Sequence, residues 1–250
     1  MIDTHAHLLM LDVEKITNQM KENGLDKIVT ISTTVSDSKQ NIELAKAFEN
    51  VFVAVGIYPE YAPDVSDNDL EKIEELASAE KVVAIGEIGL DYHGENFDKQ
   101  AQKKVFVKQL EIANRLCLPF CVHCRNAAED VYKVLSENRH LIKHGGLMHC
   151  YSEGKNWVHK FLEFGMYISF SGNITFKKSD RSFLKDIPLD KLLVETDSPY
   201  LSPEPFRGQK NEPKNVRYVL EKIAEEIGMS ASELDKITTE NAKRFYNIKG

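Results

Sequence analysis

The sequence predicts an α/β fold, specifically a (β/α)8 TIM barrel formed by a single domain over residues 1–250. Short runs rich in Val, Ile and Phe alternate with longer amphipathic segments along the whole chain. This alternation is typical of parallel strands joined by right-handed helical crossovers. Eight such units in 250 residues match the size of one barrel. A doubly wound sheet is less favoured, because DTHAHLLM after the first strand lacks the glycine-rich phosphate turn.

The strand candidates are short and apolar, as strands buried on both faces usually are. Each run spans four to six residues. The expected strands cover residues 2–6, 27–32, 51–56, 82–87, 119–123, 146–149, 167–170 and 192–196.

The segments between these runs have helical periodicity. Gly24 ends the first of them, which follows the first strand. Ser36 is expected to cap the helix that reaches residue 48, and Asp67 or Asn68 to cap the next one. Two short helices are expected within 230–246. The other predicted helices cover 99–115, 127–135, 155–164, 179–185 and 215–227.

Composition limits the class of protein. Apolar residues make up 42% of the chain and charged residues 28%, so a large core and a well-solvated surface are both expected. The net charge of −7 argues against a basic groove over the whole surface. It still allows a nucleic-acid substrate, because bound divalent cations would make one local mouth positive.

The cysteines do not predict a zinc ribbon. Cys121 and Cys124 form CVHC, but residues three apart on a strand point to opposite faces, and no second CxxC follows. The chain shows no signal-peptide pattern and no membrane-length apolar run. We therefore expect a cytoplasmic protein with reduced thiols and no membrane partner. The acidic surface and the lack of an obvious apolar patch in the sequence favour a monomer.

Polar residues gather at the predicted strand ends. In a parallel barrel the catalytic groups lie at the C-terminal ends of the strands. MIDTHAHL places Asp3, His5 and His7 on one face, because side chains alternate along a strand. Burying several imidazoles and carboxylates together is costly unless a cation compensates them. The candidate ligands are His5, His7, Glu87, His123, His149 and Asp197.

Six ligands exceed the needs of one tetrahedral catalytic zinc ion, which keeps a position open. They suit two ions about 3.5–4 Å apart that share a carboxylate. Imidazole and carboxylate ligands suit zinc, iron, nickel or manganese, whereas mostly carboxylate and water ligands would suit magnesium. The expected sets are His5, His7 and Asp197 for one ion, His123 and His149 for the other, and Glu87 shared between them.

Two such ions predict hydrolysis. They lower the pKa of bound water and neutralise charge that develops on a phosphoryl or carbonyl oxygen. The expected catalytic residues are Glu87, as the bridge, and Asp197, which can also accept the proton of the water. The ligand set alone does not distinguish a phosphodiester from an amide or a lactone.

Five ordered segments resemble one family. IDTHAHL, GEIGLDYH, VHCRNA, MHCYSE and ETDSPYLSPEPFRGQKNEP are similar to the signature segments of the TatD family of metal-dependent deoxyribonucleases. The resemblance runs from about residue 1 to 246 and implies a (β/α)8 barrel of the amidohydrolase-like superfamily. It implies two divalent ions on the same six residues.

The resemblance also implies an activity. Family members are magnesium-dependent nucleases, several of them 3′–5′ exonucleases on single-stranded DNA. We therefore expect such a nuclease, active with magnesium or manganese, with zinc, nickel or iron as alternative bound ions. The alternative is a metal-dependent amide or ester hydrolase, or a D-aminoacyl-tRNA hydrolase, of the same superfamily.

The chain departs from the family pattern at three places. Tyr58 in GIYPEY stands where histidine is common, which bears on the substrate rather than on the metal ions. Asn126 replaces the usual aspartate after HxR. His93 follows Tyr92 where a second aromatic residue is usual, and a solvent-exposed loop position is its alternative to a role at the mouth.

Candidate substrate contacts lie in the loops after the strands. Arg125 and Arg207 are expected to bind phosphate, because the guanidinium fork matches phosphate oxygens. A structural ion pair with an acidic neighbour is the alternative for each. Tyr200, with Tyr58 and Tyr92 as weaker candidates, is expected to stack on unpaired bases, and packing is the alternative.

Overall fold

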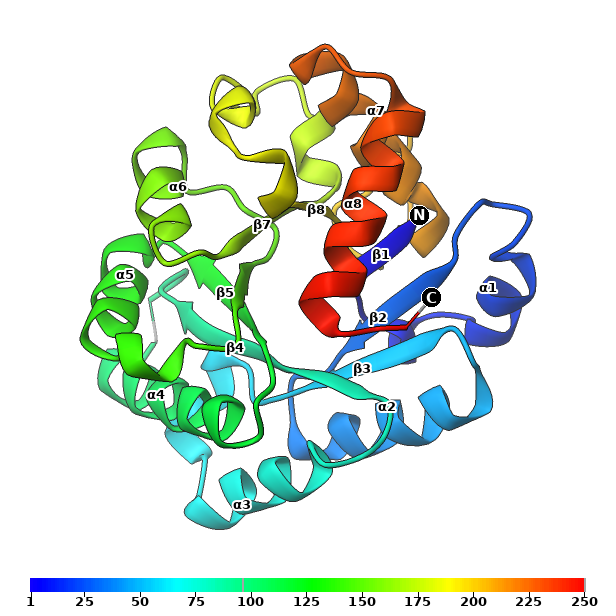
Figure 1. Cartoon of the computed structure of the whole chain (residues 1–250). Coiled ribbons are helices and arrows are strands. Elements are labelled where there is room, and N and C mark those ends of the chain that lie inside the picture. The colour runs from blue at the N-terminus through cyan, green and yellow to red at the C-terminus, as the bar shows by residue number, and fades with distance from the viewer. Residues whose placement is uncertain (96, 250) are drawn as a thin grey trace.

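The computed structural model describes residues 1–95 and 97–249 (Figure 1). Its eight strands form one sheet in the order β1 to β8, and every neighbouring pair is parallel. A further parallel bridge joins Ala6 to Ser198, so the barrel is nearly closed. The predicted TIM barrel is confirmed. The strands are β1 (Ile2–Ala6), β2 (Lys27–Ile31), β3 (Val51–Val55), β4 (Val82–Asp91), β5 (Phe120–Arg125), β6 (Gly146–Met148), β7 (Tyr167–Phe170) and β8 (Leu192–Val194).

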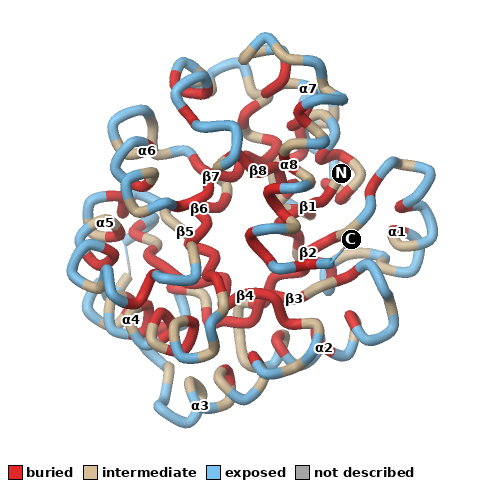
Figure 2. The backbone as a smooth tube through the Cα atoms, viewed as in Figure 1, coloured by how far each residue is buried: buried red, intermediate tan, exposed pale blue. Residues whose placement is uncertain are grey.

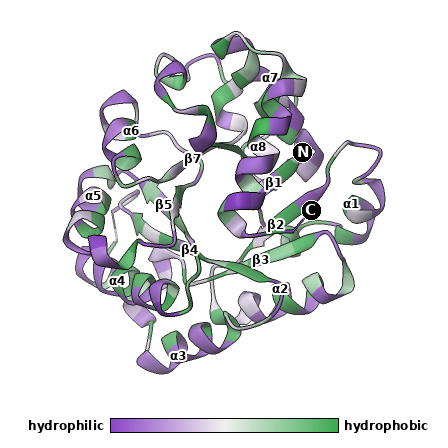
Figure 3. Ribbon diagram, in the orientation of Figure 1, coloured by the Kyte–Doolittle hydropathy of each residue, from purple (hydrophilic) through white to green (hydrophobic). Residues whose placement is uncertain are grey.

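Helices surround the strands (Figure 1). None of the described helices is long and apolar enough to cross a membrane. Figure 2 shows burial along the strands and exposure on the outer helix faces. Figure 3 shows strands such as β3 that are largely hydrophobic, whereas hydrophobic and hydrophilic residues alternate along the surrounding helices. The helices are α1 (Val13–Gln19), α2 (Val35–Ala47), α3 (Asp67–Leu76), α4 (Lys99–Arg115), α5 (Ala128–Glu137), α6 (Lys155–Leu162), α7 (Val216–Ile227) and α8 (Ala231–Tyr246).

Two predicted helix caps are wrong by one or two residues. Thr34 rather than Ser36 caps α2, and Ser66 rather than Asp67 or Asn68 caps α3. In both helices the cap hydroxyl accepts from the backbone N–H three residues later, and the aspartate there accepts from the cap in return. This reciprocal capping box satisfies two backbone donors, whereas a single polar residue satisfies one.

Two helical predictions at the C-terminal side are also wrong. Residues 179–185 do not form an α-helix, and only Leu184–Asp186 make a 3-10 turn there. Arg181 donates to the carbonyl groups of Ile174 and Phe176, which ties this segment to the preceding loop. The C-terminal segment is one helix, not two, because the Thr238 hydroxyl donates back to the Leu234 carbonyl and fits inside the helix.

Helix α8 closes one end of the barrel. Figure 1 shows it crossing in front of the strands. Its last residue, Tyr246, is buried and donates from its hydroxyl to the Thr4 carbonyl at 2.9 Å. Phe245 and Tyr246 join the interior cluster that contains Ile2 and Leu193. The loops that follow the strands are left to form the opposite end.

Glycine determines how β4 continues beside β5. Gly89 pairs with His123 and has φ +136°, a conformation that other residues rarely adopt. A Cβ atom at this position would collide with the His123 carbonyl oxygen. Because Gly89 permits this close approach, β4 extends to Asp91, four residues beyond the predicted end of the strand.

Candidate metal centre

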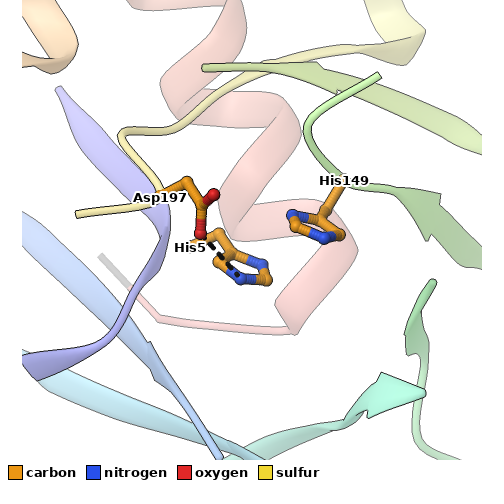
Figure 4. Close-up of side chains that lie close together, drawn as sticks. All are labelled: His5, His149 and Asp197. Atoms are coloured by element: carbon orange, nitrogen blue, oxygen red, sulfur yellow. Dashed lines mark ion pairs between the residues drawn. The ribbon is translucent and has the colours of Figure 1, made fainter. Parts of the chain in front are cut away.

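The structure brings all six predicted ligands to one rim of the barrel. His5 lies on β1, Glu87 on β4 and His123 on β5. His149 directly follows β6, and Asp197 follows β8 by three residues. Figure 4 shows His149 and Asp197 turned toward His5, whose ring stacks on that of His149 with centroids 3.9 Å apart. Three groups have ligand atoms within 4.8 Å of one another: His5, His149 and Asp197; His5, His7 and Glu87; and Glu87, His123 and His149.

Glu87 connects the two sides of the cluster. Its Oε1 lies 2.7 Å from His123 Nδ1 and 2.7 Å from His149 Nε2. Its Oε2 lies 3.6 Å from His5 Nε2 and 4.0 Å from His7 Nε2. Each oxygen of this buried carboxylate therefore faces a different pair of histidines.

Asp197 completes the side formed by β1 and β8. Its Oδ1 lies 3.4 Å from His7 Nε2 and 3.7 Å from His5 Nε2. The backbone fixes this arrangement, because Asp197 N donates to the His5 carbonyl at 2.9 Å and His7 N donates to the Ser198 carbonyl at 2.8 Å. These contacts join the end of β1 to the segment after β8 and nearly close the barrel, and we call them the seam. The seam therefore also supports His5, His7 and Asp197.

The donor set fits a divalent cation. His5 Nε2 is buried and has no hydrogen-bond partner among the described residues. An unsatisfied buried polar atom is costly, and this one faces carboxylate oxygens of Glu87 and Asp197 at 3.6 and 3.7 Å. A cation held between these atoms would satisfy all three. Imidazole and carboxylate together suit a divalent metal ion.

The electrostatics keep Glu87 ionised. Burial opposes its ionisation, but the charge of His149 and hydrogen bonds from the surrounding histidines hold its pKa well below the usual range. The pKa of His149 is raised well above its usual value, because the attraction of Glu87 and Glu195 exceeds the effect of burial. Burial and the charge of His149 lower the pKa of His5. The centre therefore contains a permanent anion beside imidazoles.

Asp91 is a site residue that the sequence analysis missed. Its Oδ2 lies 2.9 Å from His123 Nε2 and accepts a hydrogen bond from the Tyr58 hydroxyl at 2.7 Å. Although burial opposes ionisation, these two contacts lower its pKa to about 2. Asp91 stands in the segment GLDYH, but the predicted strand stopped at Glu87, so its side chain was not counted among the strand ends.

Glu195 was missed for a different reason. It is buried, and its Oε1 accepts from Cys150 N at 2.8 Å and lies 3.2 Å from His149 Nδ1. It lies inside the predicted strand run LLVET rather than at its end, where a ligand is expected. The available signal was its spacing, because Glu195 and Asp197 are two residues apart in ETD.

The predicted substrate contacts lie in different surroundings. Tyr200 is half exposed, and its ring meets the His7 ring edge-on with centroids 5.8 Å apart. Arg125 is exposed at the end of β5. Arg207 is exposed and lies over the Phe176 ring at 3.7 Å. Within the described residues, no ion pair links either arginine to an acid, so the structure does not provide the predicted alternative role.

The burial of Tyr92, His93 and the two cysteines of CVHC decides three other sequence predictions. Tyr92 is buried and donates from its hydroxyl to Asp130 at 2.9 Å, so it packs rather than faces the mouth. His93 is exposed on the loop after β4. Cys121 lies in the barrel interior and Cys124 packs against the outer core, which confirms that they do not face one site.

Comparison with known proteins identifies the family of the chain. The sequence profile of the TatD related DNase family matches residues 2–247. The uncharacterized metal-dependent hydrolase YabD of Bacillus subtilis strain 168 is 40% identical over 254 residues, covering 99% of each chain. The 3'-5' ssDNA/RNA exonuclease TatD of Pectobacterium carotovorum is 31% identical over 245 residues, covering 95% of this chain and 94% of its own. The crystal structure of YjjV, a TatD homologue from Escherichia coli K12, matches with TM-score 0.93 and 28% identity over 99% of this chain and 98% of that one. The chain therefore belongs to the TatD family of metal-dependent hydrolases.

Proposed function

We propose that the protein is a two-metal nuclease that hydrolyses phosphodiester bonds of DNA, removing nucleotides from the 3′ end of single strands. The observation that carries this proposal is the placement of Glu87, whose two oxygens face separate pairs of histidines. A carboxylate shared in this way is what a pair of ions about 3.5–4 Å apart requires. The relative from Pectobacterium carotovorum, described as an exonuclease on single-stranded DNA and RNA, supports the choice of substrate.

The six side chains divide into two ligand sets around Glu87. Magnesium or manganese is proposed for activity, and zinc, nickel or iron as other ions that the same ligands could bind. When bound, the cations would supply Lewis acidity at the scissile phosphate and lower the pKa of a water molecule. The proposed sets are His5, His7 and Asp197 on one side, His123 and His149 on the other, and Glu87 shared.

The remaining work falls to residues of the chain. Burial opposes ionisation of Asp197, but the neighbouring histidines lower its pKa, so it is a carboxylate that can accept a proton from the attacking water. Arg125 and Arg207 would bind phosphate oxygens of the strand, and Tyr200 would contact a base beside His7.

The test uses single-stranded DNA labelled at either end, incubated with purified protein and magnesium or manganese. Shortening from the 3′ end that stops on addition of a chelator is the expected result. His149→Ala should abolish it, whereas His144→Ala, an exposed histidine away from the rim, should not. No cleavage beyond the His149→Ala background, together with hydrolysis of acylated substrates, would overturn the assignment to phosphodiesters.

A further inference from the structure

Exposed apolar side chains are concentrated around the candidate metal centre. Leu9 and Met10 lie in the 3-10 turn after β1, Tyr61 lies in the turn after β3, and Tyr200 follows β8. Met10 is 49% exposed, Tyr61 45% and Tyr200 50%. Among the described residues, the one other exposed large apolar side chain is Leu189, which at 38% matches Leu9; it precedes β8 and therefore lies toward the opposite end of the barrel.

We name Leu9, Met10, Tyr61 and Tyr200 the collar, and contacts of Tyr200, Met10 and Tyr61 connect it with the ligands. On one side the Tyr200 ring meets His7, and the Tyr200 hydroxyl lies 3.5 Å from Met10 Sδ. On the other side the Tyr61 ring lies 6.5 Å from the Tyr58 ring, which lies 4.8 Å from His123.

The position of the collar identifies what can occupy it. A ligand resting on Tyr200 also lies beside His7, so the occupant is part of the substrate. The part of the ligand that contacts the collar must be apolar and flat. Exposed tyrosine rings and a methionine side chain bind mainly through apolar contact with a ring face, not through a set of hydrogen bonds. Lys210 provides a positive charge at the same place, since its Nζ donates to the Met10 carbonyl at 2.6 Å. Flat rings joined by anionic groups describe an unpaired strand of nucleic acid.

We infer that the collar of Leu9, Met10, Tyr61 and Tyr200 binds unpaired nucleobases next to the scissile phosphate, with Lys210 on an adjoining phosphate. The inference rests on the proposed function and adds the residues that select the substrate. Stacking needs the open face of a base and does not read its edge, so the collar tolerates any base sequence. A base still paired in a duplex has no free face to offer at this site.

The test compares Tyr61→Ala with Tyr61→Phe, which keeps the ring, and with Leu189→Ala, which removes an exposed apolar side chain toward the far end of the barrel. Each protein is assayed on a single strand and on the same strand with abasic sugars at its last three 3′ positions. Tyr61→Ala should raise KM on the normal strand by about tenfold with little change in kcat. Tyr61→Phe and Leu189→Ala should match the wild type. On the abasic strand all four proteins should be alike.

Fluorescence anisotropy of a labelled single strand measures binding without relying on cleavage. Met10→Ala serves as a second collar variant and should also weaken binding. Wild-type levels of KM and affinity in both collar variants, with cleavage intact, would overturn the collar and leave the proposed function standing. Failure of the wild-type protein to bind or cleave any strand would overturn both.

Discussion

The two sides of the candidate metal centre orient their histidines by different means. On the side of β5 and β6, a carboxylate lies behind each ring. Asp91 Oδ2 lies 2.9 Å from His123 Nε2, and Glu195 Oε1 lies 3.2 Å from His149 Nδ1. A carboxylate behind the ring accepts the N–H of one nitrogen and leaves the lone pair of the other directed at the site.

On the side of β1 and β8, backbone contacts replace these carboxylates. His5 Nδ1 faces the Cys121 thiol at 3.6 Å, which is a weak hydrogen-bonding group. The seam instead holds His5 and Asp197 through the bond from Asp197 N to the His5 carbonyl. Asp3 reinforces the seam by accepting from Thr196 N at 2.9 Å.

This difference affects the basicity of the histidine rings as well as their position. A carboxylate behind an imidazole makes the ring a stronger ligand, whereas a backbone bond only positions it. We therefore expect the side of His123 and His149 to depend on its supporting side chains more strongly than the side of His5 and His7. Substitution of the residue common to both sides, and then of the supporting residues on each side, tests that expectation.

Glu87→Gln should produce the largest effect, because it removes the charge that both sides share while keeping the side-chain shape. We expect loss of bound metal at both positions and a fall in activity of more than about 100-fold, beyond what a supporting residue causes. Metal content after dialysis, measured by elemental analysis, and kcat/KM on single-stranded DNA provide the measurements. Glu22→Gln, at an exposed position on the barrel exterior, is the matched control. Retention of one full equivalent of metal by Glu87→Gln would contradict a shared carboxylate.

Glu195→Gln should weaken one ion selectively. The amide can donate toward His149 Nδ1, so it no longer enforces the proton there, and affinity at this side should fall about 10- to 100-fold. Asp91→Asn should act in the same direction through His123. Calorimetric titration with manganese separates the two binding events. If Glu195→Gln weakened both events equally, the two sides would not be independent in the way their contacts suggest.

The pH dependence should show the competition between protons and metal. In the metal-free protein the pKa of His149 is raised well above its usual value, mainly by Glu87 against the effect of burial. This contribution to stability is fully present below about pH 6.5 and is lost as pH rises through the raised pKa. Metal needs the neutral ring, so its stabilising effect should grow over the same range. Melting temperatures with chelator and with manganese, from pH 5.5 to 9, should diverge as pH rises, and parallel curves would count against histidine ligation.

The sequence predicted the ligands better than their supports, for a physical reason. Glu87, His123 and His149 end apolar runs, and parallel strands bring such ends to one rim whatever their separation along the chain. Asp91 acts through its contact with His123 and Glu195 through its contact with His149, and no periodicity along the chain encodes these long-range contacts. Both contacts depend on details that only the folded chain determines, such as the extension of β4 that Gly89 permits.

Local hydrogen bonds from side chains to the backbone explain the remaining differences between the predicted and the observed helices. Thr34 replaced Ser36 as a helix cap because the partner carboxylate stands three residues after Thr34. Residues 179–185 have an amphipathic pattern, but Asp180 accepts from Ser182 N and forms a turn instead. Patterns of apolar residues therefore predicted the elements of the barrel, while side-chain-to-backbone bonds determined where each one begins or fails to form.

Cys121→Ala should have the smallest effect on metal binding. It compares most directly the group behind His5 with the group behind His149. The thiol lies behind His5 as Glu195 lies behind His149, yet it is a weak partner, and the backbone seam positions His5 without it. We expect affinity for manganese to change by less than about threefold, against the much larger loss in Glu195→Gln. Calorimetric titration of both variants under one condition makes the comparison, with the unfolding transition of each recorded because Cys121 is fully buried. A loss of affinity in Cys121→Ala as large as that in Glu195→Gln, in a protein that remains folded, would show that His5 also relies on the group behind its ring.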